Sequence, residues 1–385
     1  MKIVLFFLSL LYSGLIFANP YIKYSSSGSS KATQQNETAT ITGKITDTKG
    51  NPLIYASVFI ANTTLGTISD EHGDYRLGHI PLGQHTIVAS YVGYEFQKVS
   101  ININMSLLNQ DFQLKKATLE IDAVEVKDKK GRNKWKQNFK KFEKSFIGVS
   151  ENASLCKITN PKVLIFHYSK ETRILSAEAR EPLVIENNGL GYTIHYTLEK
   201  FELHKNGLRM YLGSAQFTPM KTEYKGNIER WKKNREFAYK GSLHHFLKAL
   251  AHDSLIKSGF VVQSVSSMNP TNNEKEVDYI LNLHPDPVGK DIQVHTGRYY
   301  YERRLWFSNT LDIIYTNEAE GFAYGATMDP RYRLKSFQQS WIRLQKKDAL
   351  FNIMGYLNDP NSIIVYGYWA FESMAEALPQ DYEPD

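Results

Sequence analysis

Short β-type runs alternate with turn signals between Thr40 and Lys115, and this alternation limits the possible folds more than any other feature of the chain. The runs are ITGKITD, ASVFIAN, GTIS, DYRL, HTIVASYV, QKVSINI and DFQLK, separated by DTKGNP, DEHGD and IPLG among other turns. Strands of this length and spacing are typical of a sandwich. The sequence therefore predicts a seven-stranded β-sandwich over residues 40–116.

The turn residues of this region have physical roles. Gly50 follows Asp47 in a turn that needs a positive φ, and Pro52 starts the next strand where no ladder donor is required. Residues 70–74, DEHGD, form a hairpin in which Gly73 takes the left-handed position. This acidic hairpin lacks the Asp/Asn alternation and the closing Glu of a calcium loop, and we interpret it as a plain turn.

A set of twelve residues carries a recognisable spacing. They are Gly43, Asp47, Gly50, Pro52, Gly66, Asp70, Gly73, Tyr75, Pro81, Gly83, Gly93 and Tyr94. The pattern resembles the carboxypeptidase regulatory-like domain, a prealbumin-like β-sandwich common at the N-terminus of TonB-dependent outer-membrane receptors of Gram-negative bacteria. The resemblance implies a sandwich exposed in the periplasm, and it implies no catalysis by this module.

The N-terminus has the features of an export signal. Lys2 precedes an apolar run, Ile3 to Leu11, and residues 16–18 end in a small residue, so residues 1–18 are predicted to be a signal peptide cleaved between Ala18 and Asn19. A membrane anchor is the alternative, but the run is short of the roughly 20 residues that span a bilayer. Residues 19–39 are Ser-rich and polar, which indicates a flexible linker.

Residues 117–147 are predicted to be a linker followed by a basic amphipathic helix. The segment 119–127, LEIDAVEVK, resembles the link between such a module and a receptor plug, although an extra strand or a plain linker is favoured. Residues 127–144 contain nine Lys/Arg, and Trp135, Phe139, Phe142 and Phe146 recur on one helical face. This aromatic stripe is expected to dock on the following domain, while peripheral contact of residues 127–146 with an anionic membrane is the alternative.

Residues 148–385 are predicted to be an α+β domain, which makes the whole chain mainly β with an α+β part. Strand-like runs precede two helical patterns over 227–241 and 242–259, and further runs follow, including VDYILNL (277–283), before a terminal helix in FESMAEALP (371–379). The block from Trp231 to Leu250 and the closing GYWAFESMAEALPQDYEP resemble the body of uncharacterised exported proteins, and that resemblance brings no activity. The only cysteine, Cys156, rules out an intramolecular disulfide and is interpreted as a buried apolar residue.

The sequence contains no catalytic pattern that we assign, and the S-x-x-K matches that start at Ser154 and Ser254 are interpreted as chance. No histidine starts an HExxH or HxxE zinc motif, and His244, His245 and His252 have no evident acidic partner beyond Asp253. There is no G-x-S-x-G elbow and no phosphate-binding loop. The net charge of +6 is too small for a nucleic-acid binder. No catalytic, cofactor-binding or metal-binding residue is therefore assigned.

These observations predict an exported, non-enzymatic cell-envelope protein in the periplasm or at the outer membrane of a Gram-negative bacterium. The sandwich is interpreted as an adaptor, attached to a domain that binds an envelope protein or a glycan. Two alternatives stay open. One is a hydrolase of envelope glycans or peptides with its site in residues 148–385, and the other is a membrane-surface accessory of a TonB-dependent uptake system.

Overall fold

A computed structural model describes residues 38–117, 129–271, 273–283 and 291–384 of the protein. The predicted signal peptide with its cleavage site at Ala18 and Asn19, the linker up to residue 37 and the segment 119–127 lie outside these residues. Within them, no helix is both long and apolar enough to cross a bilayer. Residues Glu37–Asp385 cluster as one compact unit.

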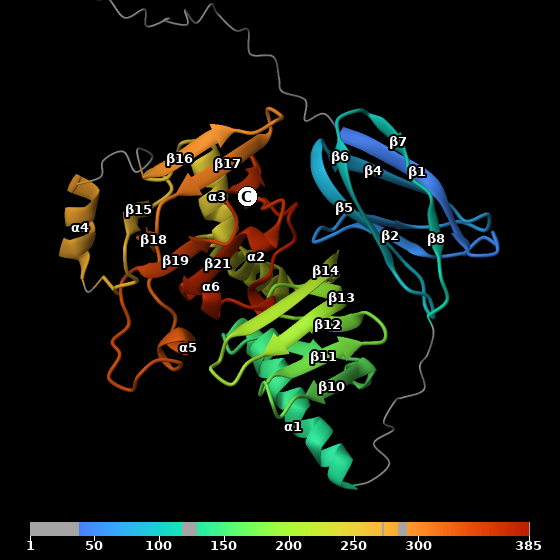
Figure 1. The fold of residues 1–385 in the computed structure, drawn as a ribbon, viewed down its shortest axis with the longest axis horizontal. Coiled ribbons are helices and arrows are strands. Elements are labelled where there is room, and N and C mark those ends of the chain that lie inside the picture. The colour runs from blue at the N-terminus through green and yellow to red at the C-terminus, as the bar shows by residue number, and fades with distance from the viewer. Residues whose placement is uncertain (1–37, 118–128, 272, 284–290, 385) are drawn as a thin grey trace, which may run out of the picture. The chain divides into compact units, whose positions relative to one another are not determined.

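The N-terminal region is a sandwich of two four-stranded sheets (Figure 1). One sheet contains β1 (Thr38–Asp47), β4 (Asp74–Pro81), β7 (Leu107–Asn109) and β8 (Phe112–Leu114). The other contains β2 (Ser57–Ile60), β3 (Gly66–Ile68), β5 (Gly83–Ser90) and β6 (Gln97–Ile103). Alternate residues such as Ile41 and Ile45 of β1 and Val58 and Ile60 of β2 are buried between the sheets. The predicted sandwich is confirmed.

Residues 38–117 form eight strands and not the seven predicted, because β7 precedes the last predicted strand, DFQLK, which corresponds to β8. β7 and β8 both run parallel to β1, beside its first and second halves. Between them, the Gln110 amide donates to the Thr42 carbonyl at 2.8 Å, and the Asp111 side chain accepts from the Lys44 amide at 2.8 Å. These bonds replace the regular ladder for two residues, so the sheet continues past the break.

The predicted turns are held by aspartate side chains. Asp47 accepts from the amides of Lys49 and Asn51, and Asp70 accepts in the same way from His72 and Asp74. These bonds are the Asx-turn pattern, in which the carboxylate replaces a backbone acceptor. The acidic hairpin at residues 70–74 is therefore a plain turn.

The first sheet of the body contains β9 (Cys156–Ile158), β10 (Leu164–Tyr168), β11 (Leu175–Ala179), β12 (Leu183–Asn187), β13 (Tyr192–Leu203) and β14 (Arg209–Pro219). The basic helix α1 (Lys129–Phe146) covers one face of this sheet (Figure 1). Phe142 and Phe146 are completely buried there, and the Trp135 indole donates to the Leu164 carbonyl at 3.1 Å. The interpretation that the aromatic stripe docks on the following domain is confirmed.

The second half of the body has a separate apolar core. The helices of this half are α2 (Lys225–Tyr239), α3 (Leu243–Ala251), α4 (Glu274–Leu283), α5 (Phe322–Gly325) and α6 (Tyr368–Phe371). Of these, α2 contributes Ala238 to the first core. One sheet orders β15 (Phe260–Val265), β18 (Thr310–Tyr315), β19 (Gln338–Leu344) and β21 (Ile363–Gly367), and a smaller one orders β16 (Ile292–Thr296), β17 (Glu302–Phe307) and β20 (Ala349–Asn352). Phe246, Leu247 and Leu250 of α3 are buried in this core. The α+β class is confirmed.

Two element predictions in the body are wrong. VDYILNL is not a strand but part of α4, because Asn273 accepts from the Glu276 amide at 3.2 Å at the helix start and Val277 and Ile280 form an apolar helical face. FESMAEALP is not a regular helix, because only single turns form at residues 368–371 and 374–376. Its backbone bonds to other parts of the chain instead, as described next.

Candidate functional site

The C-terminal segment 368–384 connects the cores of the body. The Trp369 indole donates to the Gly241 carbonyl at 2.6 Å in the second core. Further along, the Asn187 side-chain amide donates to the Ala375 carbonyl at 2.9 Å in the first core. Distant partners therefore satisfy the polar groups that a terminal helix would have paired internally.

The same segment reaches the sandwich at Asn62, which follows β2. The Asn62 amide donates to the Ala215 carbonyl of β14 at 2.6 Å, and the Asn62 side chain accepts from the Ala215 amide at 3.1 Å. The Phe217 amide donates to the Thr63 carbonyl at 3.0 Å, and the Gln380 amide donates to the Asn62 carbonyl at 2.7 Å. Asn62 has a φ of 63°, a conformation that asparagine tolerates better than most residues.

Two side-chain contacts extend this connection. Asp381 accepts from the Thr64 amide at 2.9 Å and also from the Thr64 hydroxyl, across 317 residues of sequence. Lys98 of β6 forms an ion pair with Glu199 of β13. The sandwich is thus bonded both to the first sheet of the body and to the C-terminal segment.

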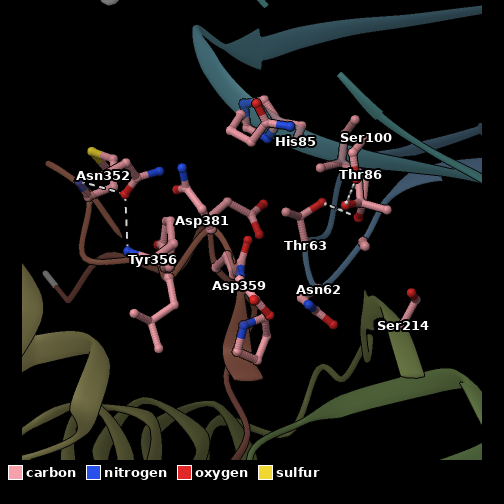
Figure 2. Close-up of a pocket in the computed structure, with 18 of the residues that line it drawn as sticks. Asn62, Thr63, His85, Thr86, Ser100, Ser214, Asn352, Tyr356, Asp359 and Asp381 are labelled. Atoms are coloured by element: carbon pink, nitrogen blue, oxygen red, sulfur yellow. Dashed lines mark hydrogen bonds between the residues drawn. The ribbon is translucent and has the colours of Figure 1, made fainter. Parts of the chain in front are cut away.

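A cavity of about 450 Å³ opens beside these bonds, and we call it the polar cavity. Its lining comes from the ends of β2, β5 and β6, from β14, and from residues 352–361 and 380–383. Figure 2 shows His85, Thr86 and Ser100 on the sandwich side and Asn352 and Tyr356 on the other. The volume lies in the range of roughly 300–1,000 Å³ that is usual for small-molecule sites.

The lining of the polar cavity contains four carboxylates and one lysine, and every one of the carboxylates has a partner. Glu199 pairs with Lys98, Asp359 with Lys346, Asp381 with Thr64 and Glu383 with Lys248. The hydrogen bond from Lys346 lowers the pKa of Asp359. These groups stabilise the walls, and their bonds do not leave a pair placed for general acid and base chemistry.

His85 offers a polar atom to the cavity, whereas the Tyr356 hydroxyl is enclosed by the surrounding protein. The Tyr356 hydroxyl is buried and has no hydrogen-bond partner within the described residues. His85 donates from Nε2 to the Pro81 carbonyl at 2.8 Å when Nε2 carries the proton, and burial lowers the pKa of His85, so the ring is neutral at pH 7. Its Nδ1 is then an acceptor. The arrangement can bind a polar group, and it contains no evident nucleophile.

The twelve signature residues fall into four places. Pro81 lines the polar cavity, while Gly93 and Tyr94 line a second cavity described below. A Cβ on Gly66 would lie 2.5 Å from the Gln216 side chain of β14, so this glycine permits close contact with the body. The other members lie within the sandwich: Gly43, Asp47, Gly50, Pro52, Asp70, Gly73, Tyr75 and Gly83.

Among the signature residues, Gly43 is the one for which the structure shows most clearly why glycine is needed. A Cβ at this position would lie 1.9 Å from the Gln110 carbonyl oxygen, where β7 ends. The Tyr75 hydroxyl donates to the same oxygen at 2.5 Å. Gly43 and Tyr75 therefore fix the break between β7 and β8.

The clustered histidines bond to backbone groups. His244 and His252 contact the carbonyls of Met354 and Ile353 at 2.8 and 2.9 Å, and His245 accepts from the Gly241 amide at 3.2 Å. Burial lowers the pKa of His244 and of His245 to about 4. Across residues 38–384 apart from the undescribed gaps, no group of three or more His, Cys, Asp or Glu side chains is placed to hold a metal.

Cys156 is partly buried against the first core of the body, and burial raises the pKa of its thiol to about 12. At neutral pH the sulfur is a protonated thiol, which is a poor nucleophile.

No sequence pattern indicates Asn62, Tyr356 or Asp381 as site residues. They belong to segments far apart in the chain, and none of them is part of a motif. The only local signal is the Asn at position 62 before Thr63 and Thr64, because asparagine is among the few residues that adopt positive φ readily.

Comparison with known proteins identifies the sandwich. Its sequence matches the CarboxypepD_reg-like domain over residues 41–126. Residues 41–126 are a CarboxypepD_reg-like domain. The TonB-dependent receptor SusC of Bacteroides thetaiotaomicron is 35% identical over 72 residues, which cover 19% of this chain and 7% of the receptor. The chain thus spans a small fraction of this relative's length.

Solved structures show only weak similarity. A cohesin and X-dockerin complex from Acetivibrio cellulolyticus has 17% identity, covers 19% of this chain and 52% of that chain, and has a TM-score of 0.17. The minor pilin GBS52 of Streptococcus agalactiae has 13% identity, with coverages of 21% and 46% and a TM-score of 0.19. TM-scores this low do not indicate a shared overall fold. The CarboxypepD_reg-like domain itself is a non-catalytic module.

Proposed function

We propose that the protein is an exported, non-enzymatic cell-envelope protein whose CarboxypepD_reg-like domain is an adaptor on a partner-binding body. The observation that supports this most is the match of residues 41–126, a region related to a TonB-dependent receptor. The compartment we propose is the periplasm or the outer membrane. The body, residues 148–385, supplies the surface for an envelope partner.

The contacts of the adaptor support this division of roles. The Asn62 loop is bonded to β14 and to Gln380, so the module is attached to the body through contacts besides the chain connection. For the glycan-hydrolase form of the alternative, two carboxylates must be free to act on a substrate. The carboxylates of the polar cavity are engaged in ion pairs and hydrogen bonds, and we therefore favour binding over hydrolysis.

Cell fractionation tests the proposed compartment. The full chain with a C-terminal tag is produced in a Gram-negative host, and we expect the tag in the envelope fractions at the size of residues 19–385. The matched control lacks residues 1–18 and is expected in the cytoplasm. Recovery of the full chain in the cytoplasm at its uncleaved size would contradict the proposal.

A second role, contact with an anionic membrane surface, rests on the charge of α1. Its exposed side chains include Arg132, Lys134, Lys136, Lys140, Lys141 and Lys144. Because the aromatic face is packed on the body, the helix has only this cationic face to offer, and the contact would be electrostatic.

Vesicle co-sedimentation tests this role. The chain is mixed with vesicles of one-third anionic lipid, and we expect binding at 50 mM salt that is largely lost at 500 mM, because salt screens exposed charges. Replacing Lys134, Lys136, Lys140 and Lys141 by Glu should abolish it. A control variant carries Glu at four exposed lysines elsewhere: Lys205, Lys221, Lys225 and Lys257. Equal binding by both variants would rule out α1 as the contact.

A further inference from the structure

A second cavity, also of about 450 Å³, lies against the sandwich, and we call it the aromatic cleft. One wall is formed by the sandwich and contains five aromatic residues. They are Tyr55, Phe59, Tyr91, Tyr94 and Phe96. The opposite wall comes from the body, mainly from residues 179–184, from His195–Leu198 of β13 and from Gln216 of β14. The chemistry of the two walls differs, and this difference indicates what the cleft can bind.

Tyr55 is held in an uncommon conformation at the edge of the cleft. It has a φ of 60° and is 67% exposed, although left-handed backbone costs a bulky residue about 1–3 kcal/mol. Ser69 fixes this backbone: its carbonyl accepts from the Tyr55 amide at 3.1 Å, and its hydroxyl bonds to the Ala56 amide and the Leu53 carbonyl. The fold therefore presents an aromatic ring to solvent at an energetic cost, with no burial of that ring in return.

The turn after β5 presents three more rings, Tyr91, Tyr94 and Phe96, whereas Phe59 on β2 is 3% exposed and forms the floor of this wall. The Tyr94 amide donates to the Tyr91 carbonyl at 3.0 Å, and the two rings lie 5.4 Å apart between centroids. Residues 115–117 support this turn through bonds to Glu95 and Gly93. Phe96 is 36% exposed beside them. The aromatic wall is thus formed in advance, so that binding a ligand requires little ordering.

The opposite wall supplies hydrogen-bonding groups. Arg180 offers donors and Glu181 offers acceptors, both on exposed side chains of the turn between β11 and β12. Burial lowers the pKa of His195, so its ring is neutral at pH 7 and has one donor and one acceptor nitrogen. The charges of Arg180 and Glu181 cancel. A ligand that fits this wall is uncharged and rich in both donors and acceptors.

A peptide fits the cleft poorly. Extended peptides commonly bind by adding a strand to a free sheet edge. The lining strands β2, β5 and β13 have strand neighbours on both sides: β2 lies between β3 and β5, β5 between β2 and β6, and β13 is paired with β11, β12 and β14. The remaining edge, on β14, is bonded to Asn62 and Thr63 through Ala215 and Phe217. The ligand must therefore be recognised by side chains. Sugar rings have apolar faces that pack on aromatic rings and hydroxyls that both donate and accept.

We propose that the aromatic cleft binds a neutral glycan, with a sugar ring packed on Tyr55 and Phe96 and its hydroxyls bonded to Arg180, Glu181 and His195. This inference names a ligand for the binding role proposed above and rests on it. Cell fractionation tests the proposed compartment and the titration below tests the ligand, so the failure of one proposal can be distinguished from the failure of the other.

Isothermal titration of the full mature chain with neutral oligosaccharides of glucose, mannose, galactose, xylose and N-acetylglucosamine tests the inference. We expect at least one of them to bind with a dissociation constant below about 1 mM. Tyr55→Gly and Phe96→Ala should each weaken this binding at least tenfold. Tyr55→Gly should leave the melting temperature unchanged or raise it, because glycine adopts a φ of 60° without strain.

Ile68→Ala is the matched control, because Ile68 is 58% exposed on the neighbouring strand β3 and does not line the cleft. It should bind as the unmodified chain does. The inference is overturned if none of the neutral oligosaccharides binds, if Tyr55→Gly binds as tightly as the unmodified chain, or if a charged oligogalacturonate or a proline-rich peptide binds at this cleft instead.

Discussion

The interior of the CarboxypepD_reg-like sandwich and its boundary with the body are held together in different ways. In the interior, Ile41, Val58 and Ile87 are completely buried between two sheets, and apolar contact dominates. At the boundary, Phe59 and Ala61 belong to only a small apolar cluster. Most of the remaining contacts there are hydrogen bonds and the Lys98 to Glu199 ion pair.

This difference predicts that single substitutions change the free energy of unfolding by more in the interior than at the boundary. Burying an aliphatic side chain completely contributes about 1.5–3 kcal/mol, whereas a hydrogen bond contributes about 1 kcal/mol net. Interfaces that are small and polar permit relative motion of the parts they join. The interior should therefore respond strongly to single substitutions, and the boundary should respond in small steps.

The largest effect is expected in the interior, at Gly43→Ala. The added Cβ would lie 1.9 Å from the Gln110 carbonyl, so the break between β7 and β8 must shift. We expect a loss of at least about 3 kcal/mol of sandwich stability, measured by urea unfolding. The control is Gly78→Ala on β4, where the nearest atom to the new Cβ is the Thr40 hydroxyl at 3.7 Å. Similar losses in both variants would show that close packing at Gly43 is unimportant.

An intermediate effect is expected at the boundary, at Asn62→Ala. This substitution removes the acceptor for the Ala215 amide and places alanine at a φ of 63°. We expect a loss of about 2 kcal/mol in the same measurement. Asn62→Gly keeps the backbone conformation and removes only the side-chain bond, so it should cost about 1 kcal/mol. A larger loss for glycine than for alanine would contradict this account.

A smaller effect is expected for the contact between Thr64 and Asp381. Its atoms are partly exposed, so its net contribution should be below about 1 kcal/mol. A double-mutant cycle with Thr64→Val and Asp381→Asn measures the coupling energy directly. A coupling energy above about 2 kcal/mol would contradict this prediction, because the contact would then contribute as much as a buried aliphatic side chain in the interior.

The last test extends the comparison to pH. Burial raises the pKa of Glu318, in the body, to about 7, whereas Asp359 at the polar cavity has a lowered pKa. For a raised pKa, the folded state holds its proton more tightly than the unfolded state, whose value is 4.5. This contribution to stability is therefore present below pH 4.5 and is lost as the pH rises through about 7.

The melting temperature should fall between pH 5 and pH 8, and Glu318→Gln should reduce the slope. Glu372 and Glu376 also have raised pKa values because of burial, so part of the slope should remain. Glu229→Gln, at an exposed position on α2, is the control. An unchanged slope in Glu318→Gln would show that this carboxyl does not hold its proton in the folded state.

Local patterns predicted the elements that depend on local forces. The strands and Asx turns of the sandwich follow from period-two alternation and from Asp and Gly at the turns, and α1 follows from aromatic residues at helical spacing. The strand predicted for VDYILNL was wrong because a short apolar run fits a strand and a helix equally well. The cap formed by Asn273 at the helix start favours the helix. The helix predicted for FESMAEALP was wrong because contacts of its backbone with Ile147 and Asn187 replaced its internal helical bonds.

The sites could not be predicted in the same way. The polar cavity combines residues 60–65, 199 and 212–214 with 352–361 and 380–383, and no local rule relates segments so far apart. The aromatic cleft has the same property, because the positive φ of Tyr55 cannot be read from the sequence. That conformation depends on Ser69, a residue on the far side of a hairpin.

By itself, the sequence determined that residues 40–116 form a β-sandwich that resembles the CarboxypepD_reg-like domain, because alternation and turn chemistry act between residues close in the chain. Only the tertiary structure decided which side chains of that sandwich meet the body. Asn62, Tyr55 and Asp381 acquire their roles from partners up to 317 residues away, and such contacts depend on how the folded surfaces pack.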